Sequence, residues 1–127
     1  MRAIGITVAG LCAAGVAVAG GMAIAAPGGS SQAPYAQAGA LVNADGTIVH
    51  AKDVAAVRKP AGHTFCVEIS NPDVDLSRAI VEATPRDGIG TTLRAIAGGC
   101  ANGKGVLVAT YDANGGGRAS GFYLAVL

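Results

Sequence analysis

Aromatic residues are scarce in this chain. Its 127 residues include no tryptophan, two phenylalanines and three tyrosines. Carbohydrate-binding β-domains usually present platforms of exposed aromatic rings, so this composition argues against a typical sugar-binding surface. Phe65 and Phe122 are expected in the core. Tyr111 and Tyr123, on strands expected to pair, are the remaining candidates for a small ligand-binding patch, or else a packed cross-strand pair.

Charged residues are also few and evenly balanced. They make up 13% of the chain, with nine basic and eight acidic side chains. From residue 39 onward we count eight of each sign. A domain without a net positive field does not collect polyanions, so nucleic acid is not an expected partner.

Motifs that bind metals or phosphate are absent from the sequence. The only histidines, His50 and His63, have no further ligand at a recognisable spacing. The glycine runs 98–99 and 115–117 do not follow the strand–loop–lysine–helix order that cradles phosphate. The sequence therefore predicts neither a metal site nor a cofactor.

Two residue pairs are candidates for catalysis. Cys66 could act as a nucleophile with His63 as its base, but a spacing of three places them on opposite faces of a strand. Glu68 and Glu82 could form a carboxylate pair on neighbouring strands, although both are expected as surface charges. The sequence therefore favours a domain that is not an enzyme.

The amino-terminal region has the features of a secretory signal peptide. Arg2 is followed by an uncharged run over 3–26 that ends in small residues. Cleavage after the triplet 23–25 gives a signal peptide over 1–25, and 36–38 is a second candidate triplet.

An uncleaved membrane anchor is the alternative, because the run exceeds twenty residues. Its alanine, glycine and valine content partitions only weakly into lipid, so we expect cleavage and no stable membrane insertion afterwards. The mature protein would be secreted or associated with the cell surface. Residues 26–38 are then expected as a flexible linker and 39–127 as one folded domain.

Two of the three cysteines remain after cleavage, namely Cys66 and Cys100. An exported chain enters an oxidising compartment, where an even number of cysteines favours a disulfide. The sequence therefore predicts a structural Cys66–Cys100 bridge.

In the folded region, apolar and polar residues alternate over short segments, as is typical of β-strands, and no segment shows helical periodicity. In 63–70 the apolar Phe65, Val67 and Ile69 alternate with polar residues or cysteine, which predicts a half-buried strand. The segment 106–111 is apolar on both faces, as in a central strand, and we expect it to form a closing hairpin with 120–126. About seven short strands predict an all-β antiparallel sandwich, jelly-roll-like or Greek-key. The predicted segments are 41–42, 47–50, 54–58, 63–70, 79–84, 91–97, 106–111 and 120–126. The first two are expected to form a tight hairpin, because Asn43, Asp45 and Gly46 are typical turn residues. A turn over 59–62 is expected to join 54–58 to 63–70.

Several motifs resemble a family of small exported β-domains. They are Asn-Ala-Asp-Gly-Thr-Ile over 43–48, a strand that ends in Arg58, Gly62 followed by Phe-Cys-Val at 65–67, and Phe-Tyr-Leu at 122–124. The chain is similar in these to uncharacterised exported proteins of actinobacteria. The resemblance implies a secreted β-domain and supplies no activity or site residues.

These observations together predict a structural or interaction module outside the cell. The two-faced strand 106–111 and the few charges in the last hairpin would suit a homo-oligomer. The alternative is a small extracellular ligand-binding or hydrolytic protein.

Overall fold

The computed structural model describes residues 29–127, so the predicted signal peptide lies outside the described residues. The described chain consists of β-strands and loops, with no helix long and apolar enough to cross a membrane. The strands are β2 (Gly29–Ser30), β3 (Ala38–Val42), β4 (Ile48–Lys52), β5 (Val54–Ala61), β6 (Thr64–Ile69), β7 (Val81–Pro85), β8 (Thr92–Ala97), β9 (Gly105–Tyr111) and β10 (Phe122–Val126).

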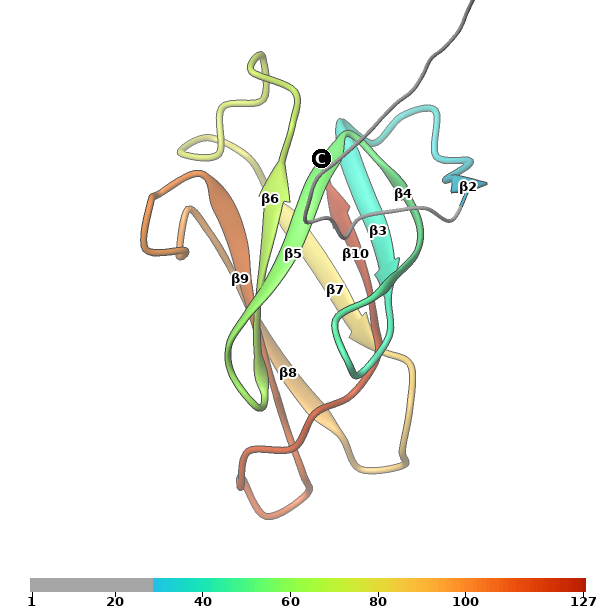
Figure 1. Ribbon diagram of the computed structural model, residues 1–127, viewed down its shortest axis with the longest axis vertical. Coiled ribbons are helices and arrows are strands. Elements are labelled where there is room, and N and C mark those ends of the chain that lie inside the picture. The colour runs from blue at the N-terminus through green and yellow to red at the C-terminus, as the bar shows by residue number, and fades with distance from the viewer. Residues whose placement is uncertain (1–28) are drawn as a thin grey trace, which may run out of the picture.

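The strands form two sheets that face each other, as Figure 1 shows. One sheet has the order β2-β4-β3-β10-β7, and the other has the order β5-β6-β9-β8. Every pairing is antiparallel except that of β2 with β4. The predicted all-β sandwich is therefore confirmed, with nine strands in the described region rather than about seven.

The core lies between the two sheets and is built from small and β-branched residues around two aromatic rings. Phe65 on β6 and Phe122 on β10 are fully buried, and their ring centroids lie 5.0 Å apart in an edge-to-face arrangement. Such contact is favourable because the positive edge of one ring meets the negative face of the other. The other buried members are Ala38, Ala40, Val42, Val67, Val106, Val108, Leu124 and Val126.

The predicted alternation in β6 is confirmed, and it explains the position of the disulfide. Phe65 and Val67 point into the core, whereas Cys66 lies on the outer side of its sheet, where it is bonded to Cys100. The two Cα atoms are 5.7 Å apart and 34 residues apart in sequence. The loop that carries Cys100 is thereby attached to the outer side of the four-stranded sheet.

Gly105, the first residue of β9, leaves room for this bridge. A Cβ atom at that position would lie 2.7 Å from the Sγ of Cys100 and 2.7 Å from the carbonyl oxygen of Val67. Both distances are shorter than side-chain contacts allow, so a larger residue would displace the bridge or the strand.

The first predicted hairpin is confirmed. The backbone N–H of Asn43 donates to the carbonyl of Thr47 at 2.8 Å, and Gly46 closes the turn with a positive φ of 92°. Asp45 accepts from the N–H and the hydroxyl of Thr47, which is the turn chemistry expected of an aspartate at this position.

The second hairpin is longer than predicted. The segment 59–62 was expected to form the turn, but β5 extends to Ala61, and Gly62 and His63 turn the chain instead. Residues Arg58, Lys59 and Pro60 therefore lie on an edge strand, where charged residues and proline prevent pairing with other chains.

The predicted closing hairpin is wrong. The chain does turn back beside β9, because Arg118 N–H donates to the carbonyl of Thr110 at 3.1 Å and Gly117 bridges to Tyr111. It then leaves for the other sheet, where β10 lies between β3 and β7. The central position of β9 is nevertheless confirmed, between β6 and β8.

Part of the predicted linker is attached to the domain. The short strand β2 pairs with β4, and the N–H of Gln37 donates to the carbonyl of Val126 at 2.8 Å. The ammonium group of Lys52 donates to the carbonyls of Ala33 and Ala36 at 3.0 and 2.6 Å. Residues 29–37 are therefore attached to the five-stranded sheet, from its edge beside β4 to the start of β3, rather than extending freely from it.

Candidate functional site

The outer side of the five-stranded sheet carries apolar residues that the sandwich leaves uncovered. Directly opposite residues on antiparallel strands share a face, so the register defines rows across the sheet. One row, the tyrosine row, consists of Thr84, Tyr123, Leu41 and His50. The next, the middle row, consists of Glu82, Ala125, Gly39 and Lys52. Beyond it, Ile80 and Leu127 exchange backbone hydrogen bonds.

Exposure confirms that these residues point away from the core. Along β10, Phe122 is fully buried, Tyr123 is 49% exposed and Leu124 is 4% exposed. At the end of the same strand Leu127 is 48% exposed, and Ile80 beside it is 66% exposed. We call the set Leu41, Tyr123, Ala125, Leu127 and Ile80 the outer apolar face.

The middle of this face projects least. Gly39 has no side chain, and a Cβ atom there would lie 2.8 Å from the carbonyl oxygen of Leu124. Ala125 beside it contributes one methyl group. The middle row is therefore lower than Tyr123 and Leu41 beside it, and the Gly39 backbone is buried.

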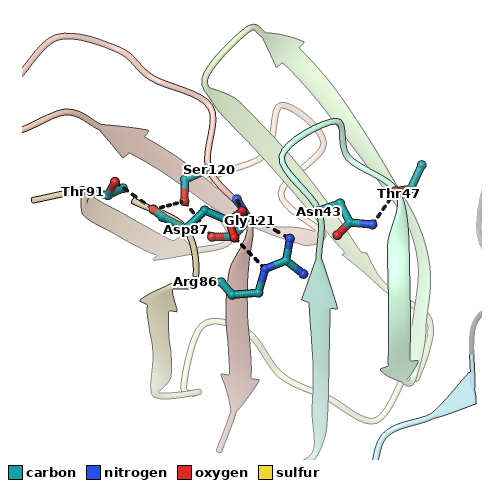
Figure 2. Close-up of polar contacts among 7 residues, drawn as sticks. All are labelled: Asn43, Thr47, Arg86, Asp87, Thr91, Ser120 and Gly121. Carbon is teal, nitrogen blue, oxygen red and sulfur yellow. Dashed lines mark hydrogen bonds and ion pairs between the residues drawn. The ribbon is translucent and has the colours of Figure 1, made fainter. Parts of the chain in front are cut away.

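A polar network at the loop end of the sheet holds β10 in place (Figure 2). One carboxylate oxygen of Asp87 accepts from Arg86 Nε at 2.9 Å, and the other accepts from the N–H of Gly121 at 2.8 Å. The carbonyl of Asp87 accepts from the hydroxyls of Thr91 and Ser120 at 2.9 and 3.1 Å. The N–H of Arg86 donates in turn to the carbonyl of Gly121 at 2.7 Å. These bonds join the start of β10 to the end of β7, and thereby place Tyr123 on the outer apolar face.

The same bonds stabilise the ionised form of Asp87. The hydrogen bond from Arg86, followed by that from the Gly121 N–H, lowers the pKa of the Asp87 carboxyl below its usual range. A carboxyl group whose pKa is lower in the folded state contributes stability above its unfolded pKa, and this contribution is lost as the pH falls through the lowered value.

We therefore expect an acid-dependent change in stability that Asp87→Asn reduces. The variant should be less stable than the wild type at pH 7, and the difference should shrink as the pH falls below about 4. Urea unfolding between pH 2 and 7, followed by circular dichroism, measures this. Asp73→Asn is the matched control, because the Asp73 carboxylate accepts no hydrogen bond from another residue of the described chain. An Asp87→Asn difference that stays constant with pH would contradict the expectation.

The predicted tyrosine patch does not form. Tyr111 shares the outer side of the four-stranded sheet with Thr92 and Arg94, whereas Tyr123 lies on the outer side of the five-stranded sheet. The two rings therefore face away from each other, on opposite surfaces of the sandwich. The His63 ring packs against Tyr111 instead, with centroids 5.5 Å apart.

Neither candidate catalytic pair is assembled. Cys66 is held in the disulfide and is not available to a base at His63. Glu68 lies on β6 and Glu82 lies on β7, which belong to different sheets. Glu68 instead forms an ion pair with Arg58 Nε at 2.5 Å across the β5–β6 hairpin.

A hollow lies at the end of the sandwich opposite the Asp87 network. It has a volume of about 640 Å³ and is lined by residues 69–72, 74–77, 103 and 104. Its polar groups serve the loop itself, since Asp75 accepts from the N–H and hydroxyl of Ser77. Within 29–127, no group of three or more histidine, cysteine or acidic side chains could hold a metal ion.

The fold and this surface define a disulfide-linked β-sandwich with one uncovered apolar sheet face. No family model, curated protein or solved structure matches the chain.

Several residues of the outer apolar face were not singled out by sequence reasoning. Ile80 and Leu41 were expected only as strand residues, and Glu82 was considered for a different pairing. Alternation in 120–126 does predict that Tyr123, Ala125 and Leu127 share one face. Their neighbours could not be predicted, because they come from strands paired through distant contacts.

Proposed function

We propose that this protein is an exported interaction module that binds a protein surface through its outer apolar face, and that it acts by binding rather than by catalysis. The observation that carries the proposal is the gathering of Tyr123, Leu127 and Ile80, all substantially exposed, on one face of one sheet. Contiguous exposed apolar residues with a polar rim are typical of protein-interaction sites. Threonine, glutamate, histidine and lysine side chains form that rim.

Export is supported by two features. The uncharged run over 3–26 after Arg2 is typical of a signal peptide. The Cys66–Cys100 bridge suits an oxidising compartment outside the cytosol.

Site-specific photo-crosslinking in the organism that produces the protein tests this proposal. A benzoylphenylalanine introduced at Tyr123 should yield covalent adducts on irradiation, because position 123 is within the proposed contact surface. The matched control carries the same residue at Tyr111, on the opposite surface, and should yield few adducts. Equal labelling at both positions, or none at 123, would refute the proposal.

A further inference from the structure

The middle row, on the outer side of the five-stranded sheet, has opposite charges at its two ends. Glu82 on β7 and Lys52 on β4 are separated by Ala125 and Gly39. Three strand spacings place the two ends about 14 Å apart. They are therefore too distant to pair within one molecule.

Neither charge is neutralised inside the described chain. The ion pairs found within 29–127 join Arg58 to Glu68 and Arg86 to Asp87. Lys52 donates to two backbone carbonyls, which orient its ammonium group but carry no net charge. Glu82 is exposed. Two charges of opposite sign without an ion-pair partner in the described chain, Lys52 half-buried and Glu82 exposed, thus flank the two small residues at the centre of the face.

This arrangement is self-complementary, and it points to one kind of partner. We propose that a second copy of the chain docks on the outer apolar face about a two-fold axis parallel to the strands, midway between β3 and β10. The proposal rests on the proposed function and names its partner. This rotation places β7 of one copy over β4 of the other, and β10 over β3. Each row of one copy lies over the same row of the other, because positions along the strands do not change. Glu82 of each copy then lies over Lys52 of the other.

The charges also select this axis over the alternative. An axis running across the strands would place Glu82 over Glu82 of the second copy and Lys52 over Lys52. Like charges in contact oppose association, so that arrangement is disfavoured. The axis parallel to the strands instead forms two ion pairs at the edges of the contact.

The apolar rows agree with the same rotation. In the tyrosine row, Tyr123 of one copy lies over Leu41 of the other, and this contact occurs twice. Side chains on a strand lean along the strand direction, so each tyrosine ring can lie over the methyl group of Ala125, which is half-buried. Tyrosines buried near the centre of a contact commonly supply much of the binding energy.

The size of the face sets the expected affinity. Four strands of five residues cover about 19 by 17 Å. This area is below that of a standard stable interface, which buries about 800 Å² on each partner. The dimer is therefore expected to be reversible and to dissociate on dilution.

Sedimentation velocity with charge-reversed chains tests the proposal. The wild-type mature chain should show monomer at low concentration and dimer at high concentration. Glu82→Lys and Lys52→Glu should each weaken dimerisation by about tenfold or more. Each variant places charges of the same sign at positions 82 and 52, which meet across the contact. An equimolar mixture of the two variants should dimerise again, since every contact then joins opposite charges. Arg94→Glu, a charge reversal on the other sheet, is the matched control and should leave dimerisation unchanged.

Zero-length crosslinking of the unmodified chain gives a measurement that does not depend on variants. A carbodiimide should join Glu82 to Lys52 in peptides that mix ¹⁴N-labelled and ¹⁵N-labelled copies. A wild-type chain that stays monomeric, a variant mixture that stays monomeric, or a dimer without this crosslink would overturn the proposal. Photo-crosslinking at position 123 then decides the proposed function separately. Adducts whose mass differs from that of a dimer would keep the proposed function while excluding self-association, and an absence of adducts would reject both proposals.

Discussion

Removing the disulfide with Cys66→Ala and Cys100→Ala together is expected to lower the free energy of unfolding by about 3–4 kcal/mol. The bridge joins residues 34 apart in sequence and thereby restricts the unfolded chain. Both cysteines are also nearly buried, so their loss removes packing on the outer side of the four-stranded sheet. Because a domain of this size is only marginally stable, the double variant should be largely unfolded or close to its midpoint at 37 °C.

Urea unfolding of the wild type and the double variant measures this effect. Alkylation of the denatured wild-type protein, followed by mass spectrometry, serves as the control. Cys66 and Cys100 should resist alkylation until a reductant is added. Two thiols that react without reductant, or a double variant as stable as the wild type, would show that the bridge does not stabilise the domain.

Truncating a core ring is expected to have an effect of similar size. Phe65→Ala should lower the free energy of unfolding by about 3–5 kcal/mol, through lost burial and the cavity left behind. Phe65 is fully buried and contacts Phe122 from the facing sheet, so its removal weakens the contact between the two sheets. Phe122→Ala should behave similarly, for the same reason.

Tyr123, which follows Phe122 on β10, supplies the matched control. Tyr123→Ala removes an aromatic ring of similar size from the outer side of the sheet, where about half of the residue is exposed. Its cost should stay below about 1 kcal/mol when unfolding is measured at concentrations where the chain is monomeric. Equal costs at 122 and 123 would contradict the inward and outward alternation along β10.

Local patterns were sufficient to predict much of the fold. The alternation in 63–70 correctly placed Phe65 and Val67 inward and Cys66 outward. The apolar character of 106–111 correctly predicted a central strand. Asn43 and Gly46 correctly predicted the first hairpin, because their turn chemistry acts over a few residues.

Strand partners were less predictable, and the closing hairpin shows why. Residues 112–118 do turn the chain back toward β9, as their composition suggests. The direction of β10 depends instead on Asp87, which lies 34 residues before Gly121 and binds its N–H. No local pattern in the sequence predicts a hydrogen bond between residues 34 positions apart.

The candidate site depended on the same distant contacts. Period-two alternation by itself determined which side of a strand each residue occupies, and the even number of cysteines expected after signal-peptide cleavage indicated the bridge. Only the tertiary structure decided that Tyr111 and Tyr123 lie on opposite surfaces, and that Glu82 and Lys52 share one row. The physical reason is that side-chain direction follows from neighbouring backbone geometry, whereas strand order is decided by packing and hydrogen bonds between segments far apart in the chain.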